Sequence, residues 1–495
     1  MTTKVVKGLM WTLAGQVVPL GVSLITSPIV IRLLGAEGYG VMLLVLLIPG
    51  FLSFADFGMG MASTKFASGA YAIGLRDKEA RIVRTAALIS FLASIPAAGV
   101  MVLFSGTIVV WLNVPERLLS EASLSLKIAA ITLVINLLCL VFNTPQLTRL
   151  RMDLNTLVNA GFRIFAAVAI PIAIFLGGGL VSVFVVLFVA SSFTLLGHLF
   201  FSGRLLKELF HTSIEREAIR PMLKFGSGLV IASIAALLLI NLDKLVLTRV
   251  TSVETLAYYS VAATFAGMIT LFSGAMVPSL MPAFSQLQGD EKSTALSGLY
   301  SRGIRLNLIW VLPVLVFLAI IAKPFFTIWG GPDFGRESPL PFYILLAGLA
   351  FNVLAYYPYT AIMASGRTEI FAKLYWIELL PYMLMVVWLT MRYGAVGTAA
   401  AWSIRVVADA VIQFWLAKKV GGVSLIVRNK SSLAAATAIM LLPFLALLYF
   451  GEVNPAIVAI GVASAAVYAL VVWKKLLESE EITWITHKWN GYVNR

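Results

Sequence analysis

The sequence predicts an all-α polytopic membrane protein with about fourteen transmembrane helices. Composition is the first reason: 60% of the residues are hydrophobic and only 12% are charged, so too few polar side chains remain to cover a water-soluble globule. The second reason is the length of the apolar runs. The charge-free run from Val453 to Trp473, like most of the others, has the roughly 20 residues needed to cross a hydrocarbon core of about 30 Å.

The predicted spans follow one another with short connections between them. The first span, from Gly8 to Leu34, is too long for the core of a secretion signal and lacks a small-residue cleavage site, so we expect it to remain as a helix. In chain order the spans are 8–34, 39–64, 83–111, 122–146, 153–177, 179–203, 223–250, 255–285, 299–328, 339–364, 368–391, 394–418, 431–450 and 453–473.

The 37 lysines and arginines are distributed unevenly among the connections. Most of them fall in alternate loops, and basic residues are enriched in the cytoplasmic loops of membrane proteins. This bias predicts that both termini are cytoplasmic. Topology, together with attraction to anionic lipid, also explains the net charge of +14, so we expect no nucleic-acid partner.

A strongly charged connection between the sixth and seventh spans divides the chain into two similar halves. Shifting the chain on itself by about 217 to 219 residues aligns Arg32 with Arg249, and two halves of six helices enter the membrane from the same side, as parallel transporter repeats do. We expect an N-terminal six-helix lobe (1–203), a cytoplasmic linker (204–222), a C-terminal six-helix lobe (223–420), two additional transmembrane helices (421–476) and a cytoplasmic tail (477–495).

Three groups of short motifs carry a resemblance to a known family. The first repeat holds Arg32–Gly35, Gly38–Gly40 and Phe54–Gly60; the second holds Asn241–Leu247, Ala257–Tyr259 and Pro278–Phe284; a third group joins Ala364–Arg367 to Gly394–Ala400. Together they resemble the signature of the Wzx-type O-antigen and polysaccharide flippases, which are the polysaccharide biosynthesis transporters of the multidrug/oligosaccharidyl-lipid/polysaccharide exporter superfamily. The resemblance covers residues 7–420.

This resemblance implies two six-helix bundles around a central cavity that opens alternately to either side of the bacterial inner membrane. The cargo would be an undecaprenyl-diphosphate-linked oligosaccharide, such as an O-antigen repeat unit, carried from the cytoplasmic to the periplasmic leaflet. The resemblance also implies contact with membrane lipid, coupling to H+ or Na+, and a polysaccharide polymerase and a chain-length regulator as partners. No cofactor is expected.

One alternative with the same fold is a cation-coupled exporter of drugs or other small molecules. Multidrug exporters commonly carry an acidic residue in the first helix, whereas the first span here has no acid and offers Gln16, Ser23, Thr26 and Ser27 as polar groups. The lipid II flippases carry arginines and an aspartate in this helix, a pattern that is also missing. The small-molecule exporter is harder to reject, since it shares the fold. Its sequence would be distinguished by acidic groups gathered in one lobe, without a basic group to bind an anion.

A membrane-embedded polysaccharide polymerase or ligase is the alternative from another class. Such an enzyme would need a periplasmic loop large enough to hold catalytic groups, and the predicted outer connections are short. The three histidines, His198, His211 and His487, are scattered along the chain, so neither a metal site nor a histidine-based catalytic site is predicted. We therefore expect a transporter and not an enzyme.

The candidate substrate-binding residues are polar groups within the spans. Arg163 lies near the middle of the fifth span with Asn159 one turn earlier, and a guanidinium makes forked bonds to phosphate or carboxylate. The alternative for Arg163 is a pair with an acid from another helix. Arg405 could likewise bind substrate or pair with an acid one turn away. Asn136 and Asn143 could contact sugar or bond between helices.

The candidate ion-coupling residues are acids within the spans. A charge at the centre of the bilayer costs about 2.5–3.5 kcal/mol, so such a group needs a partner, a water cavity or a task. Glu378 lies mid-span with no basic residue three or four positions away, which suits it to bind and release a proton; Asp243 and Asp409 are further candidates. Asp56 and Lys244 are expected to be structural charges that brace neighbouring helices.

The predicted topology can be tested at Lys207, which lies in the linker. We expect a cysteine at this position, in a chain whose single native cysteine Cys139 is replaced by serine, to be labelled only by reagents that reach the cytoplasm. Labelling of Lys207→Cys from the periplasmic side would contradict the order of the spans.

Overall fold

The computed structural model describes residues 2–210, 213–287, 293–367, 369–426, 429–450 and 455–483. Within these ranges the chain is helical with no strand, and eight segments are long and apolar enough to cross a membrane, which confirms the all-α membrane fold. His211, His487 and the tail from residue 484 lie outside the described residues. Contacts divide the chain into two compact units, unit 1 (Met1–Tyr258 and Leu374–Gly394) and unit 2 (Tyr259–Lys373 and Ala395–Arg495).

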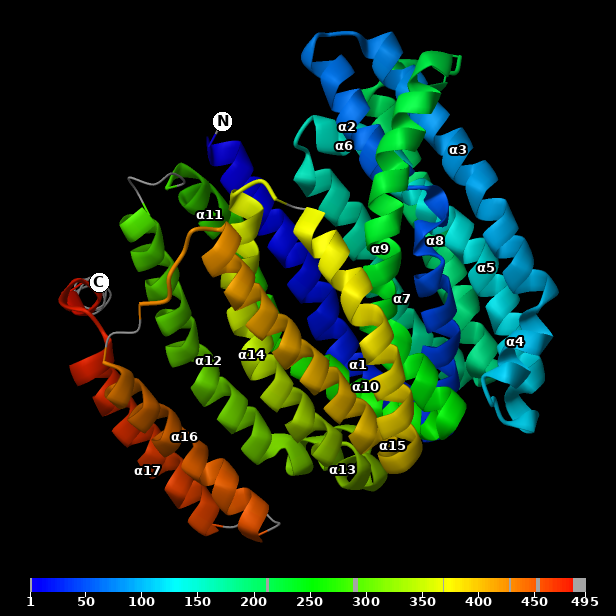
Figure 1. Cartoon of the computed structure of the whole chain (residues 1–495). Coiled ribbons are helices and arrows are strands. Elements are labelled where there is room, and N and C mark those ends of the chain that lie inside the picture. The colour runs from blue at the N-terminus through cyan, green and yellow to red at the C-terminus, as the bar shows by residue number, and fades with distance from the viewer. Residues whose placement is uncertain are drawn as a thin grey trace, which may run out of the picture. The chain divides into compact units, whose positions relative to one another are not determined.

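Unit 1 contains the helices of the first half of the chain together with two that follow them (Figure 1). Its elements are α1 (Thr2–Phe51), η1 (Ser53–Asp56), α2 (Met59–Ala72), α3 (Arg76–Leu103), α4 (Ser105–Trp111), η2 (Glu116–Leu118), α5 (Leu119–Phe142), α6 (Thr144–Thr148), α7 (Met152–Ala173), η3 (Ile174–Gly178), α8 (Gly179–Leu205), η4 (Lys207–Phe210), α9 (Arg216–Val250), the start of α10 (Val253–Gly267) and the first arm of α15 (Glu369–Val420).

Unit 2 contains the rest of α10 and the helices that come after it, including the second arm of α15. Its other elements are α11 (Ile269–Gln286), α12 (Ser293–Gly330), α13 (Pro332–Glu337), α14 (Pro339–Ala364), α16 (Lys430–Phe450), α17 (Pro455–Val471) and η6 (Val472–Leu476).

Some of these elements are two spans joined at a glycine. A straight helix of 50 residues, the length of α1, would measure about 75 Å, more than twice the hydrocarbon thickness of about 30 Å. α1 breaks at Gly35, whose φ of 72° lies in the region that favours glycine. α15 breaks in the same way at Gly394. This doubling is consistent with fourteen crossings, and the exact number stays a prediction.

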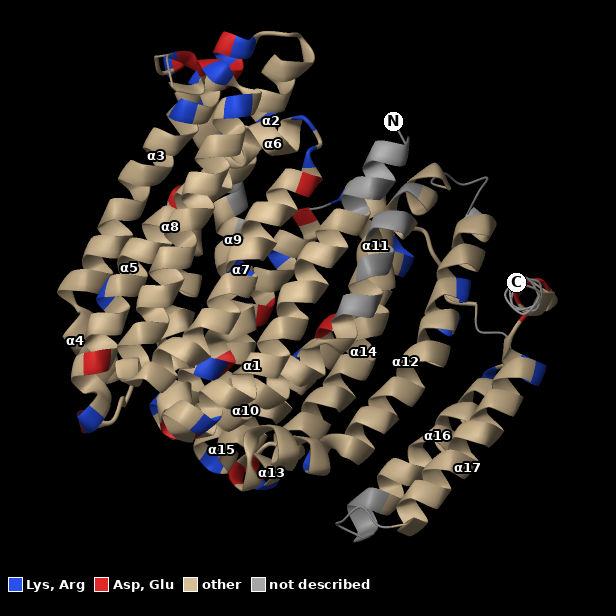
Figure 2. Ribbon diagram, turned by 180° about the vertical axis from the view of Figure 1, so that it is seen from behind, with Lys and Arg blue, Asp and Glu red and all other residues tan. Residues whose placement is uncertain are grey.

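Most charged residues lie toward the ends of the helices, as the coloured ribbon of Figure 2 shows, and the first turns of α3 carry one cluster of them. The linker predicted at 204–222 is docked against this helix. Leu206 and Leu209 are fully buried in the apolar cluster that α3 shares with α2. Arg81 Nε donates to Glu215 Oε2 at 2.7 Å, and the Glu215 N–H donates to Thr85 Oγ1 at 2.9 Å. The linker is therefore part of the packed structure of unit 1.

The two additional helices at the end of the chain, α16 and α17, pack against α12 within unit 2. The Tyr468 hydroxyl donates to the Ile309 carbonyl oxygen at 3.0 Å, in the middle of this apolar interface. At one end, Arg305 pairs with Glu478 at 2.7 Å and with Glu481 at 2.8 Å. Apolar packing along the helices and ion pairs at their end together fix the additional helices to α12.

The two units do not coincide with the two lobes expected from the repeat. Unit 1 includes α9 and the first arm of α15, which the repeat assigns to the C-terminal lobe. The lobe boundaries at residues 203 and 223 stay a prediction.

The contact between α9 and the start of α2 explains part of this grouping. A Cβ at Gly226 of α9 would overlap the carbonyl oxygen of Phe57, and a Cβ at Gly58 would lie 3.2 Å from the Gly226 Cα. The two backbones can approach this closely only because both positions lack a side chain.

We expect Gly226→Ala to lower the melting temperature of the purified protein, because the added methyl group must push α9 away from Phe57. Overpacking of this kind costs about 1–3 kcal/mol. Gly161→Ala on α7 is the matched control, since no heavy atom lies within 4 Å of where its Cβ would be, apart from its chain neighbours and the adjacent backbone of α7 itself. The control should keep or slightly raise the melting temperature, because alanine favours helix. Equal melting temperatures for the two variants would contradict this contact.

Candidate functional site

Arg163 is an exposed guanidinium within a span of unit 1. Two turns earlier on the same face of α7, Thr156 Oγ1 donates to the Trp11 carbonyl oxygen of α1 at 3.2 Å, so Arg163 lies on the α1 side of its helix. The ion pairs formed by the described residues do not include Arg163. Asn159 is bonded within α7, where its Nδ2 donates to Asn155 Oδ1 at 3.0 Å. The site therefore presents an exposed guanidinium on α7, and the two asparagines that precede it on this helix are hydrogen-bonded to each other.

The two asparagines predicted on the fourth span lie in different surroundings. Asn136 is exposed on α5, whereas Asn143, at the end of the same helix, is only 8% exposed. The Asn143 Oδ1 is buried and accepts no hydrogen bond from any described residue. Asn136 is therefore accessible at the surface of unit 1, whereas Asn143 is held inside the helix packing.

Asp56 caps a helix inside the second span. Its Oδ1 accepts from the Gly58 N–H at 2.8 Å and its Oδ2 accepts from the Gly60 N–H at 3.1 Å, which satisfies N–H groups at the start of α2. The backbone at Phe57 and Gly58 is left-handed, with φ of 51° and 69°. This carboxylate therefore stabilises the break between η1 and α2, a local contact that the sequence did not indicate.

Two buried acids lie on other helices of unit 1. Asp243 of α9 is 2% exposed and Glu378 in the first arm of α15 is 9% exposed. Beside Asp243, the Lys244 Nζ donates to Asn241 Oδ1 at 3.3 Å. The helix packing of unit 1 therefore removes both acids from the surface.

The remaining predicted site residues belong to unit 2, in the second arm of α15. Asp409 is 7% exposed, and its Oδ2 accepts from the Nε2 of Gln413, one turn further along, at 2.8 Å. Arg405 lies one turn before Asp409 and is half-buried. The structure thus places Arg405 and Asp409 in a different unit from Arg163 and Glu378.

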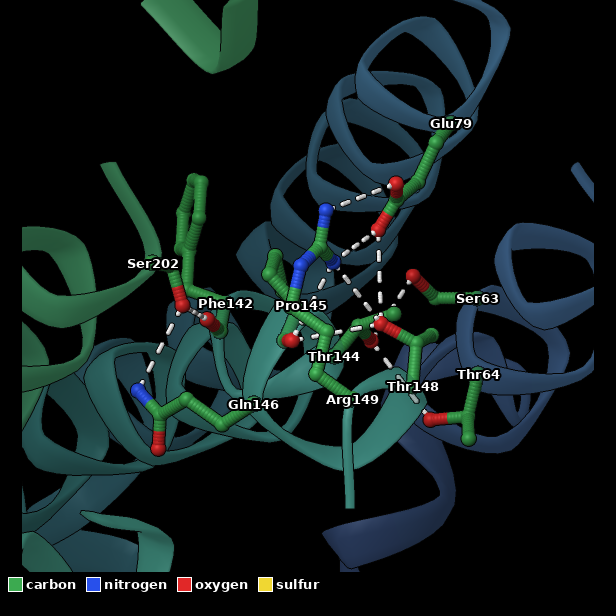
Figure 3. Close-up of polar contacts among 10 residues, drawn as sticks. All are labelled: Ser63, Thr64, Glu79, Phe142, Thr144, Pro145, Gln146, Thr148, Arg149 and Ser202. Atoms are coloured by element: carbon green, nitrogen blue, oxygen red, sulfur yellow. Dashed lines mark hydrogen bonds and ion pairs between the residues drawn. The ribbon is translucent and has the colours of Figure 1, made fainter. Parts of the chain in front are cut away.

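A buried ion pair that the sequence did not indicate joins α3 to the end of α6 (Figure 3). Arg149 Nη1 donates to Glu79 Oε1 at 2.6 Å, and Nη2 donates to Glu79 Oε2 at 3.1 Å; Glu79 is fully buried and Arg149 is 10% exposed. The guanidinium also lies 4.5 Å from the centre of the Tyr71 ring. The sequence did contain a signal for the burial of Glu79. At helical spacing it lies on the same face of α3 as Val83 and Ser90, which are also buried.

Hydroxyl and amide groups extend this network across α2, α6 and α8. Thr144 Oγ1 donates to Ser63 Oγ at 3.0 Å. On the other side, Gln146 Nε2 lies 3.1 Å from the Nδ1 of His198. Ser202 Oγ donates to the Phe142 carbonyl oxygen at 2.6 Å (Figure 3). His198 is thus a buried structural residue. Among the described residues, no group of three His, Cys, Asp or Glu side chains could hold a metal ion.

Comparisons with known proteins identify relatives of the chain. Residues 5–288, more than half of the sequence, match the family described as "Polysaccharide biosynthesis protein". A proposed O-antigen transporter of Shigella flexneri is 22% identical over 426 residues, which cover 83% of this chain and 97% of that protein.

Two solved structures share the fold. An inward-facing multidrug resistance transporter of the MATE family, in the MOP superfamily, has a TM-score of 0.70 at 13% identity, and the match covers 80% of this chain and 93% of that one. The lipid II flippase MurJ, in an inward closed conformation, has a TM-score of 0.65 at 12% identity, with 92% and 100% covered. At these identities the likeness concerns the fold alone.

We expect the Glu79–Arg149 pair to be a strong stabilising contact of unit 1. Glu79→Gln or Arg149→Gln should each destabilise the purified protein by about 3–5 kcal/mol, because each leaves an opposite charge buried alone. The double variant should lose less than the sum of the two. Arg151→Gln and Asp153→Asn are the control, since that pair is 46% and 37% exposed and should contribute at most about 1 kcal/mol. Additive losses at 79 and 149 in thermal unfolding would contradict the pairing.

Proposed function

Because the chain belongs to the polysaccharide biosynthesis protein family, we propose that it is a flippase for an undecaprenyl-diphosphate-linked oligosaccharide. The cargo, an O-antigen or other surface polysaccharide repeat unit, passes from the cytoplasmic to the periplasmic leaflet of the bacterial inner membrane by alternating access. The relatives with an assigned role are transporters and a flippase, so the chain is a transporter and not an enzyme. In this proposal both termini are cytoplasmic.

The exposed guanidinium of Arg163 is the observation that carries the choice of substrate. An exposed charge within a span is stable only in a water-filled cavity or beside an opposite charge, since hydrocarbon alone would cost about 2.5–3.5 kcal/mol. A diphosphate has the charge and the oxygen geometry that a planar guanidinium binds through two parallel bonds. Asn159 and the exposed Asn136 add amide groups that suit the hydroxyls of a sugar.

Ion coupling in this proposal uses the buried acids Glu378 and Asp243 of unit 1, with Asp409 as the corresponding acid of unit 2. A carboxylate removed from water gains stability when it takes up a proton or a cation. Cation uptake on one side of the membrane and release on the other would then drive the return of the empty transporter. A polysaccharide polymerase and a chain-length regulator would receive the cargo after transfer.

A small-molecule exporter is the second candidate, because the fold is shared with a multidrug resistance transporter. The family match and the basic group on α7 both favour an anionic, lipid-linked cargo instead. The two candidates differ in what accumulates when transport fails: lipid-linked oligosaccharide inside the cell for the flippase, and toxic compounds for the exporter.

Replacement of Arg163 tests the proposed grip on the diphosphate. We expect Arg163→Ala to reduce surface polysaccharide at least about tenfold, since the charged hydrogen bonds that it removes are each worth about 1.5–3 kcal/mol. Arg163→Lys should restore transport only in part, because an ammonium keeps the charge but not the fork. The readout is surface polysaccharide and cytoplasmic lipid-linked oligosaccharide, measured in cells with equal amounts of inserted protein.

Arg151→Ala is the matched control for this test. Arg151 stands just before α7, is exposed and pairs with Asp153 at 2.8 Å, so its loss should leave export unchanged. Normal export by Arg163→Ala would show that this guanidinium does not bind the cargo.

Replacement of Glu378 tests the proposed coupling. Glu378→Gln keeps the shape of the side chain and removes its charge. In proteoliposomes, transport by the wild type should rise with an imposed ion gradient, and the variant should lose this response while it still binds substrate. An unchanged response to gradients of both H+ and Na+ would assign Glu378 a structural role.

A further inference from the structure

Unit 2 contains a cavity of about 380 Å³ whose lining includes none of the residues proposed above for substrate or ion binding. This volume falls within the range of about 300–1,000 Å³ that is usual for ligand sites. Its lining is apolar except for one lysine and one tyrosine. The lining residues are Tyr300 of α12, Phe351 and Leu354 of α14, Ala410, Val411, Phe414 and Lys418 of α15, and Val423 and Leu425 of the segment that follows.

The rim of this cavity has the character of a surface that faces hydrocarbon. Phe351 is 48% exposed and Val411 is 61% exposed. Along the second arm of α15, Ile404, Val411 and Trp415 form an exposed apolar stripe at helical spacing. A stripe of this kind on a transmembrane helix suits contact with lipid chains, which favours a cavity mouth that opens toward the bilayer.

The end of the cavity is closed by a strap, residues 421–426, which α12 holds in place. The Ser424 N–H donates to Ser297 Oγ at 3.0 Å, and the Ile426 N–H donates to Ser301 Oγ at 2.8 Å. The alternate residues Val423 and Leu425 then line the cavity. These two hydrogen bonds fix the strap to α12, and with it the closed end of the cavity.

The charge at the closed end is positive. Lys418 lines the cavity, and no described residue forms an ion pair or hydrogen bond with its ammonium group. From Ala410 to Ile426 the sequence contains Lys418 and Lys419 and no acidic residue. Lys419 lies over the ring of Trp415 at 5.0 Å, and tryptophan is enriched at the level of the lipid headgroups.

We propose that this cavity binds one anionic phospholipid of the surrounding leaflet. An acyl chain occupies the apolar cavity, and the phosphate of the headgroup lies against Lys418. The apolar lining supplies affinity for any phospholipid chain, whereas Lys418 supplies the preference for a net negative headgroup, since a zwitterionic headgroup carries a compensating cation. The bound lipid would brace the strap and the α12–α14–α15 packing of unit 2. This inference does not depend on the identity of the transported cargo.

The test is native mass spectrometry of the full-length protein titrated with phosphatidylglycerol or with phosphatidylcholine. We expect the wild type to bind one phosphatidylglycerol about fivefold more tightly than phosphatidylcholine. One lysine near a membrane surface contributes about 1 kcal/mol to the binding of an anionic lipid, which corresponds to this ratio. Lys418→Gln should bring the two affinities close to equal. Val411→Trp should weaken the binding of both lipids at least about tenfold by filling the mouth of the cavity.

Two controls separate a site from general attraction. Lys419→Gln removes a neighbouring charge outside the cavity lining, and Val467→Trp adds the same bulk at an exposed position of α17. Both should bind lipid as the wild type does. Wild-type binding by Val411→Trp, or equal losses at Lys418 and Lys419, would overturn the site. Displacement of phosphatidylglycerol by equimolar undecaprenyl phosphate would overturn the assignment of a phospholipid as occupant.

Discussion

The absence of water from the hydrocarbon core is the constraint on which the rest of this structure depends. Every peptide group in the core must be hydrogen-bonded within a helix, so the chain crosses the core as helices. Between two crossings it reverses at a single glycine, such as Gly35 or Gly394. Where a span is broken, a side chain must replace the missing bonds, and the Asp56 carboxylate does so at the start of α2. Glu79, whose charge enters the helix packing, is paired with Arg149.

The same constraint separates residues that hold the fold from residues available for transport. The charged groups that hold the fold bond to partners inside unit 1, as those of Glu79, Arg149 and Asp56 do. Arg163, in contrast, is exposed on α7. The close contact between Phe57 and Gly226 joins α9 to α2 with no side chain between them. Any alternation of access that moves α9 relative to α2 must break this contact, which makes it a place where conformational change and stability are coupled.

The all-α membrane class and the family could be predicted from the sequence, because apolar runs and glycine-centred motifs are local signals. The exposure of Arg163 and the burial of Glu378 could not be derived in this way, since they depend on which helices become neighbours. Glu79 was overlooked because it stands in a run of charges, Arg76 to Arg81, that reads as a solvated loop. The docking of the linker was overlooked for the same reason: Glu215 and Arg81 look like ordinary surface charges until their helices pack.

Reconstitution of leaflet transfer tests the central claim most directly. The purified full-length protein would be placed in vesicles that carry a polyprenyl-diphosphate oligosaccharide in the inner leaflet, and the arrival of sugar outside would be followed with an impermeant oxidising enzyme. A flippase should accelerate this arrival well above the rate of protein-free vesicles and leave free sugars and dyes inside. Sugar arrival at the protein-free rate, together with ion-driven export of a cationic dye by the same vesicles, would contradict the proposed function.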